Sequence, residues 1–440
     1  MRNVLRAVAL TILFAMSCTF APLTRADSDD DLVQGRERDE DEIQLGPRPF
    51  YLVEGMAPSP LKSRLLRCKE GPFRRTDFSI GHRGAALQFP EHTRESYQAG
   101  ARMGAGIVEC DVTFTSDGHF VCRHAENDLH TTTNILLTDL ARSCVKPFTP
   151  AEFDASGKLV RAAGAECRAS ALTLEQFKSL QGKMDAFNPA ARTPQEFVAG
   201  TPSWRTDLYT GRGTLMTLRE SIELNRRNGV KHTPELKGGD ADTIRKVFGG
   251  QEQYAQKFAD ELQAARVDPR DAWPQSFNVN DVLYWLRNTP YGRQAVFLID
   301  YDASKDNIVL LDTAGKQLET REEQLAFFKQ LRAAGVRIIA PAMPALLAVN
   351  GDRVVPSQLG RDLRRLGFDL ITWTFERSDL RQGASKAGFY YDFDPTGAAI
   401  KTDSDMYKAL DLLARDLRIL GIFSDWPATV TYYANCMGLK

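Results

Sequence analysis

Three acidic residues of this sequence lie in two short apolar segments, where ionised groups are costly to bury. Glu109 and Asp111 are two residues apart in the first segment, and Glu235 lies in the second, two residues before Lys237. Because side chains alternate along a strand, Glu109 and Asp111 would share a face, with Cα atoms about 6.6 Å apart. Two such carboxylates repel each other unless a proton or a cation lies between them. These oxygen ligands therefore predict a site for one divalent cation, Ca²⁺ or Mg²⁺, beside a lysine that suits an anionic group.

Histidines are concentrated around the first of these segments. Five of the six lie between residues 82 and 130, and both His82 and His124 end an apolar run. A pair of imidazoles beside a metal suits general acid and general base catalysis near neutral pH. Arg83 adds a forked donor for phosphate oxygens. This set is chemically complete for metal-assisted cleavage of a phosphodiester.

The elements that must position these residues alternate between strand and helix. Apolar runs of strand character lie at 78–81, 107–114, 120–124, 232–237, 274–278, 296–301, 338–343, 371–375 and 422–425. Segments with apolar positions three and four apart lie at 94–103, 218–228, 254–266, 324–334, 359–366 and 407–420. Strand followed by helix, repeated to about eight strands, predicts an α/β fold in the form of a closed TIM (β/α)8 barrel. An open doubly wound sheet is the alternative, but no G-x-G-x-x-G follows the first strand and no G-x-x-x-x-G-K-[ST] occurs in the chain.

Two long segments interrupt this alternation. Residues 126–215 are too many for a plain connection and predict a subdomain inserted after the second strand region. Residues 382–405, which contain the sequence FYY at 389–391, predict a candidate lid. Both segments would leave the C-terminal end of the barrel, where the active sites of this architecture lie.

Four stretches resemble the glycerophosphodiester phosphodiesterase family in order and spacing. They are FSIGHRG at 78–84, FPEHTRES at 89–96, GAGIVECDV at 104–112, and SDG at 116–118 followed by VCRH at 121–124. Weaker similarity follows in PELK at 234–237, QSF at 275–277, TWT at 372–374 and GIFSD at 421–425. The resemblance covers the chain from about residue 77 to residue 430.

The resemblance implies a TIM barrel that hydrolyses glycerophosphodiesters to sn-glycerol 3-phosphate and an alcohol. It implies a divalent cation held by Glu109, Asp111 and Glu235. It also implies an acid–base pair, His82 and His124. Arg83 and Lys237 would bind the phosphate. Trp373, near the end of a strand, is either barrel filling or an apolar wall for the glycerol moiety of the substrate.

The sequence also departs from the family pattern. His92 replaces the asparagine of the usual Pro-Glu-Asn-Thr, and Arg123-His124-Ala125 replaces a His-Asp pair. These changes keep the reaction class and leave the preferred alcohol open. His92 either caps the following helix or contacts the site, and Glu91 either favours the helix N-terminus or belongs to the site.

The first 26 residues have the layout of a cleavable secretory signal. Arg2 and Arg6 precede an apolar run at 7–20, which is shorter than the ~20 residues needed to span a bilayer. A lipoprotein cleaved at Cys18 fits less well, because no leucine lies three residues before it. We therefore expect an exported, soluble protein, periplasmic or secreted, with no stable membrane span after cleavage. Residues 27–60 predict a disordered leader, rich in acids at its start, and residues 61–440 the barrel.

Removing the signal leaves six cysteines, an even number that suits an oxidising compartment. We expect one pair within a loop and one that joins the two ends of the domain: Cys144 with Cys167, and Cys68 with Cys436. Cys110 and Cys122 fit equally well as buried free thiols.

The overall charge narrows the classes of partner. A formal net charge of −1 gives no electrostatic footprint for nucleic acid and no polybasic patch for anionic membranes. The expected partner is a small glycerophosphodiester. A lipid phosphodiesterase similar to sphingomyelinase D or a phosphoinositide phospholipase C is the close alternative, and a non-catalytic binder of phosphodiester head groups is the alternative of another class.

Overall fold

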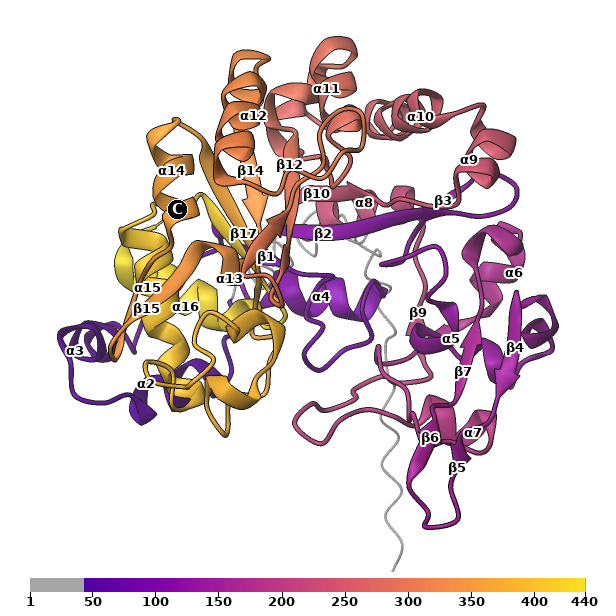
Figure 1. The fold of residues 1–440 in the computed structure, drawn as a ribbon, viewed down its shortest axis with the longest axis horizontal. Coiled ribbons are helices and arrows are strands. Elements are labelled where there is room, and N and C mark those ends of the chain that lie inside the picture. Colours follow the sequence, from indigo (N-terminus) through magenta and orange to yellow (C-terminus); the bar gives the residue numbers. More distant parts are fainter. Residues whose placement is uncertain (1–42, 440) are drawn as a thin grey trace, which may run out of the picture. The chain divides into compact units, whose positions relative to one another are not determined.

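The computed structural model describes residues 43–439, and its centre is a closed ring of parallel strands (Figure 1). Within these residues the ring comprises β1 (Thr76–Gly81), β2 (Ala105–Phe114), β10 (Lys231–Leu236), β11 (Gln275–Ser276), β12 (Val296–Asp302), β14 (Ile338–Pro341), β17 (Asp369–Phe375) and β18 (Gly421–Ser424). Each strand pairs in parallel with the next, and β18 pairs with β1 to close the ring. The predicted eight-stranded TIM barrel is confirmed.

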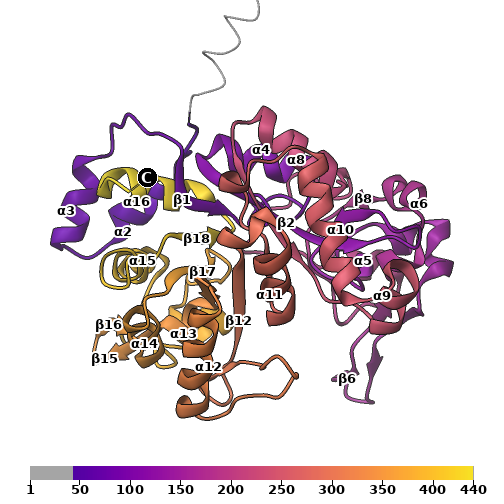
Figure 2. The same ribbon diagram turned by 90° about the horizontal axis from the view of Figure 1, so that it is seen from above.

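Helices follow the strands and cover the outside of the barrel (Figure 2). They are α4 (Arg94–Arg102), α8 (Leu218–Arg227), α9 (Ala241–Phe248), α10 (Gln251–Ala264), α11 (Val279–Asn288), α12 (Arg321–Ala333), α13 (Met343–Leu346), α14 (Gln358–Arg365), α15 (Met406–Arg415) and α16 (Pro427–Met437). Threonines begin several of them: the hydroxyls of Thr93, Thr217 and Thr320 each accept a backbone N–H of the first turn. α16 was not predicted, since it is buried along most of its length and shows no polar face.

Branched and aromatic side chains fill the interior of the barrel below the mouth. The cluster consists of Ile80, Ile107, Val296, Leu298, Ile338, Ala340, Ile371 and Phe423. Alternate residues of the same strands point outward and join a second cluster beneath the helices, as Val108 and Cys110 do from β2. The barrel is therefore a packed core, and its polar residues gather at the C-terminal ends of the strands.

The run at 120–124 does not contribute a barrel strand. It forms β3 (Phe120–Cys122), which pairs antiparallel with β2 in the register Val112–Cys122. The turn between the two strands has too few residues for the crossover that a parallel neighbour needs. The hairpin has a functional consequence, because it returns the chain toward the mouth immediately before His124.

Residues 126–215 fold around a hydrophobic core of their own. The segment contains α5 (Leu129–Thr132), α6 (Leu174–Ser179), α7 (Pro194–Val198) and the short strands β4 (Lys146–Thr149), β5 (Glu152–Phe153), β6 (Leu159–Arg161), β7 (Gly164–Glu166), β8 (Gln181–Gly182) and β9 (Gly213–Thr214). Ile135, Phe177 and Phe197 are among its buried residues. Figures 1 and 2 both show these elements beside the barrel strands, in the purple and magenta part of the chain. The segment 382–405 contains three short 3-10 turns: Ala384–Lys386, Phe389–Tyr391 and Asp403–Asp405.

The leader predicted over 27–60 is wrong in its last part. Residues 48–55 form α2 (Arg48–Gly55), and α3 (Pro60–Arg67) begins at the end of the predicted leader. Leu52, Val53 and Leu65 are buried, so these helices have apolar side chains that pack on the domain. The predicted signal peptide and residues 27–42 lie outside the described residues.

Three disulfides link the six cysteines that follow the predicted signal. Cys144 bonds to Cys167 and Cys68 to Cys436, as expected. Cys110 also bonds to Cys122, with a Cα–Cα distance of 5.3 Å. The free-thiol interpretation of this last pair is wrong, because the β2–β3 hairpin brings the two residues together. In the described part of the chain, no helix combines the length and the hydropathy required to traverse a bilayer.

Candidate active site

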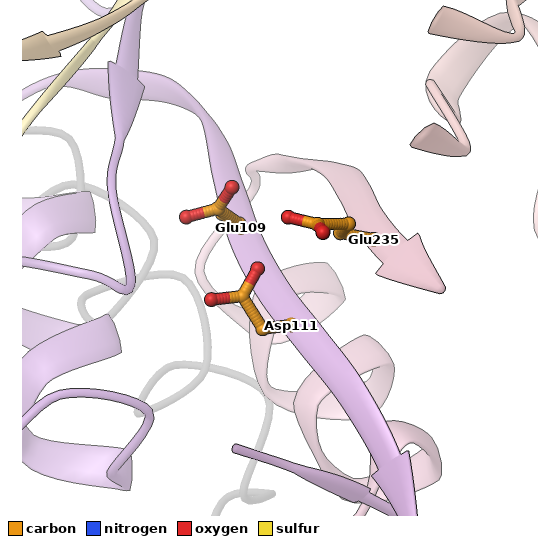
Figure 3. Close-up of side chains that lie close together, drawn as sticks. All are labelled: Glu109, Asp111 and Glu235. Atoms are coloured by element: carbon orange, nitrogen blue, oxygen red, sulfur yellow. The ribbon is translucent and has the colours of Figure 1, made fainter. Parts of the chain in front are cut away.

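Glu109, Asp111 and Glu235 converge at the mouth of the barrel (Figure 3). The first two lie on β2 and the third on the adjacent strand β10, where Glu235 pairs in register with Asp111. One carboxylate oxygen from each residue lies within 4.8 Å of the other two. All three side chains are buried. The sequence-predicted ligand set therefore lies together in one place.

The three carboxylates perturb one another strongly. Burial, followed by the negative charges of Asp111 and Glu235, raises the pKa of Glu109 well above its ordinary value. Burial also raises the pKa of Glu235 to about 8, against the effect of Lys237. Burial opposes the ionisation of Asp111 too, but Lys237 and His92 hold the pKa of that carboxyl well below its usual range. A cation between them would relieve this repulsion.

The donor atoms fit a hard divalent cation. Oδ1 of Asp111 is buried and has no hydrogen-bond partner among the described residues, so it is left facing the other carboxylates. Glu109 is oriented from both sides: its Oε1 accepts from Nε2 of Gln275 at 2.9 Å and its Oε2 from the backbone N–H of Arg83 at 3.0 Å. Such oxygen-only ligation suits Ca²⁺ or Mg²⁺.

His82 is held by a carboxylate that follows the last strand. Nδ1 of His82 lies 2.5 Å from Oδ1 of Asp425. Its Nε2 faces the carboxylate of Glu109 at 3.7 Å and the hydroxyl of Thr374 at 3.4 Å. Burial and the charge of Arg83 lower the pKa of His82 to about 4, so the ring is neutral at pH 7. Donation from Nδ1 to Asp425 leaves the lone pair of Nε2 directed at the cavity.

His124 lies in the same cavity and is not held in this way. Its ring has no hydrogen-bond partner within residues 43–439, and burial, followed by the charges of Arg83 and Lys237, lowers its pKa well below the ordinary value. The imidazole is therefore neutral and available to a ligand.

The two predicted phosphate-binding cations each contact an acid. The guanidinium of Arg83 lies 2.7 Å from Glu91 and 3.3 Å from Asp111, and Nζ of Lys237 lies 2.7 Å from Glu235. Arg83 has a φ of 53° and precedes Gly84, where a Cβ would meet the backbone of Ser96 at 2.5 Å. The HRG turn is thus pressed against the first turn of α4, which directs Arg83 into the mouth.

Glu91 and His92 both belong to the site. Thr93 caps α4, so neither residue is the cap. Nε2 of His92 lies 2.9 Å from Oδ2 of Asp111, and its Nδ1 lies 3.0 Å from the hydroxyl of Tyr97. The histidine that departs from the family pattern therefore orients one of the carboxylates.

Sequence reasoning missed a chain of ion pairs behind His82. Arg377, two residues after β17, lies 2.8 Å from Asp425 and also pairs with Asp185 of the insert. Arg205, also from the insert, lies 2.6 Å from Asp185. The only sequence signal was the position of Asp425 directly after an apolar strand.

All eight predicted site residues line one cavity of about 560 Å³: His82, Arg83, Glu109, Asp111, His124, Glu235, Lys237 and Trp373. The indole N–H of Trp373 donates to the carbonyl of Ala340 at 3.0 Å, which fixes the ring. Trp373 is therefore part of the cavity wall and not only barrel filling.

Comparison with known proteins places this site in a family. The family model described as "Glycerophosphoryl diester phosphodiesterase family" matches residues 82–427. A protein of Arthroderma benhamiae named "Extracellular protein" is 39% identical over 260 residues, which cover 58% of this chain and 100% of that protein. A glycerophosphodiester phosphodiesterase of Bacillus subtilis is 41% identical over 56 residues, 13% of this chain and 19% of that protein.

Among solved structures, a phosphodiesterase of Oleispira antarctica in complex with the product sn-glycerol-3-phosphate has a TM-score of 0.46 at 17% identity, covering 81% of this chain and 96% of that one. The family model spans the segments that supply His82, the acidic trio and Asp425. The chain therefore belongs to the glycerophosphoryl diester phosphodiesterase family, and it is a phosphoric diester hydrolase.

Proposed function

We propose that this protein is an exported, metal-dependent glycerophosphodiester phosphodiesterase, which releases sn-glycerol 3-phosphate and an alcohol. The observation that carries the proposal is the convergence of two neutral imidazoles, three carboxylates and two cations on one cavity. Family membership supports the substrate class, and the geometry is consistent with the roles proposed for the residues.

Glu109, Asp111 and Glu235 would hold one divalent cation. When bound, such an ion withdraws charge from a phosphoryl oxygen as a Lewis acid. The chain itself contributes Arg83 and Lys237, whose N–H groups neutralise the remaining phosphate charge and orient the diester.

The proton transfers fall to the two histidines. Nε2 of His82 accepts the proton of the attacking hydroxyl, since Asp425 accepts the hydrogen bond from Nδ1 and stabilises the resulting imidazolium. His124, on the β3 side of the mouth, takes up a proton when the anionic diester binds, and its imidazolium then protonates the departing alkoxide. The P–O bond to the alcohol breaks as the new P–O bond forms, and the attacking oxygen is that of water or of the substrate's own glycerol.

Three features support export. The N-terminal 26 residues have the layout of a secretory signal, three disulfides suit an oxidising compartment, and the similar fungal protein is named "Extracellular protein". Expression with the native N-terminus, followed by N-terminal sequencing of the exported product, tests this part. A mature protein that still begins at Met1 would contradict it.

The activity is tested by measuring release of sn-glycerol 3-phosphate from glycerophosphocholine and glycerophosphoethanolamine, with Ca²⁺, with Mg²⁺ and after chelation. We expect activity only with a divalent cation, and a His82→Ala variant that folds but does not turn over. Full activity after chelation would contradict the metal dependence. Full activity of the variant would contradict the role of His82.

One observation favours the lipid phosphodiesterase as a second candidate. Phe277 lies at the rim of the cavity with 39% of its surface exposed, where it could contact an acyl chain. Assaying sphingomyelin and lysophosphatidylcholine beside the two glycerophosphodiesters separates the candidates.

A further inference from the structure

The cavity has two chemically distinct halves, which follow the order of strands around the barrel. The strands β1, β2 and β10 are adjacent and position the proposed catalytic groups. His82 and Arg83 directly follow β1, the acidic trio lies on β2 and β10, and Lys237 directly follows β10. The arc formed by β11, β12 and β17 carries Phe277, Leu298, Asp300 and Trp373 instead, and Phe389 and Tyr390 lie beside them. The proposed phosphate site occupies the first half, so the second half faces another part of the substrate.

Aromatic rings form most of this second half. The ring centroid of Trp373 lies 5.8 Å from that of Phe277, 6.3 Å from that of Phe389 and 6.4 Å from that of Tyr390. Phe389 and Tyr390 meet edge to face at 5.0 Å. Trp373 is the central ring of this cluster, and the hydrogen bond from its indole N–H to the carbonyl of Ala340 fixes its orientation. Phe277 and Tyr390 meet Trp373 edge to face and Phe389 stacks on it, while the face of Phe277 already meets Nζ of Lys237 at 5.6 Å from the ring centroid.

Asp300 adds a carboxylate to this aromatic group. It lies on β12, and its Oδ1 accepts the backbone N–H of Tyr301 at 2.8 Å. No described cation forms an ion pair with it, whereas Glu91, Asp185 and Glu235 in the same cavity are each paired with an arginine or lysine. Asp300 is half-buried and its negative charge is not neutralised by the protein.

Asp300 and Trp373 stand at the same level of the mouth. Ile299, the residue before Asp300, pairs with Pro341 of β14, and the next residue of that chain segment, Ala342, forms a bridge with Trp373. A single strand therefore separates the carboxylate from the central ring, and both line the same cavity. A cation between them would meet the Trp373 ring on one side and a carboxylate on the other.

We propose that Asp300 and the aromatic group of Trp373, Phe389 and Tyr390 form a subsite for the ammonium group of a cationic alcohol. A quaternary or primary ammonium is attracted by aromatic faces and by a free carboxylate. The substrate is then a zwitterionic glycerophosphodiester, whose phosphate meets Arg83 and Lys237 and whose ammonium meets Asp300. This inference rests on the proposed function and names its leaving group.

The sharpest test compares two diesters of the same shape. In glycerophospho-3,3-dimethylbutanol a carbon replaces the nitrogen of glycerophosphocholine, so only the charge is lost. With the full-length protein and its divalent cation, we expect kcat/KM to be about tenfold or more higher for the choline ester. Equal values, or a preference for the neutral ester, would overturn the subsite.

Two variants and a control locate the effect. We expect Asp300→Asn and Trp373→Leu to bring the ratio of kcat/KM values close to one, mainly by raising KM for the choline ester. Asp302→Asn is the matched control, because Asp302 is the next acid of β12 but pairs with Lys305 outside the cavity. An unchanged ratio in Asp300→Asn would overturn the proposal. So would an equal loss for both esters in Trp373→Leu, which would assign the ring to the glycerol moiety.

The outcome is distinguishable from failure of the proposed function. If no glycerophosphodiester is hydrolysed under any metal condition, the function itself is wrong. If both esters are hydrolysed at the same rate, only the subsite is wrong. Thermal unfolding of each variant shows whether it folds, and the comparison of the two esters with the unmodified protein does not depend on any variant.

Discussion

Asp185 of the insert and Arg377 of the barrel form an ion pair directly behind His82, the proposed general base. The second amino group of the Arg377 guanidinium holds Asp425, and Asp425 holds His82. Both Asp185 and Arg377 line the active-site cavity. The insert is therefore connected to His82 through three consecutive contacts between charged or ionisable side chains.

A single substitution can break the connection between the insert and His82. Asp185→Asn removes the charge that holds Arg377 and should lower kcat about tenfold or more with little change in KM, since His82 loses its fixed orientation. Asp207→Asn is the control, because Asp207 is an exposed acid of the same insert. A loss of thermal stability in Asp185→Asn with an unchanged kcat would assign Asp185 a purely structural role.

We expect substitution of Asp425 to lower kcat more than substitution of Asp185 does. Asp425→Asn keeps the shape of the side chain but cannot stabilise a charged imidazole, so we expect kcat to fall by at least about a hundredfold. Steady-state kinetics with saturating glycerophosphodiester measure the effect. A variant that retains wild-type kcat would show that His82 does not take up the proton.

The acidic trio predicts direct binding of a cation. Titration calorimetry with Ca²⁺ or Mg²⁺ should give one site in the wild type. By mass action the free energy of unfolding should rise by about 2.7 kcal/mol when the free cation is at a hundredfold excess over Kd. Asp111→Asn and Glu235→Gln should abolish both effects. Exposed Asp242→Asn is a control that should leave them intact. A rise of the same size in Asp111→Asn would place the ion elsewhere.

His232 predicts how stability depends on pH. It is buried beside Asn225, and burial, with the charge of Arg226, lowers its pKa to about 4. The unfolded chain takes up a proton near pH 6.5 and the folded chain does not, so stability is lost as the pH falls from about 7 toward 4. This residue alone should account for about 2 to 3 kcal/mol of the loss.

Denaturant unfolding of the wild type and of His232→Asn, measured at pH 8 and at pH 5, isolates that contribution from those of the other buried histidines. The variant should lose less stability than the wild type between the two values. Equal losses would mean that His232 is protonated in the folded protein.

The sequence contained enough information for the barrel and for the residues at the strand ends. Apolar runs such as 107–114 and 296–301 are visible because strands of a parallel barrel are buried on both faces. The trio was predictable because Glu109 and Asp111 obey strand alternation, and because Glu235 repeats the pattern of an acid within a second apolar segment, two residues before Lys237. α16 was not, since a helix buried on all sides has no amphipathic pattern.

The contacts that orient the site could not be predicted in the same way. Arg377 meets Asp425 and Asp185 through the geometry of two loops, and no local pattern encodes a contact between residues so far apart in the sequence. To predict the Cys110–Cys122 bond, one would have to recognise that residues 120–122 fold back on β2. The early helices were missed because residues 48–55 follow an acidic stretch, which hid the apolar positions 52 and 53.

The bond between Cys68 and Cys436 makes most of the domain a single covalent loop. It joins the residue after α3 to the last helix, and the barrel closes where its first and last strands meet. A protease that cuts one exposed peptide bond anywhere inside this loop releases no fragment, because both pieces stay tethered to each other. A nicked molecule therefore keeps its two pieces covalently joined.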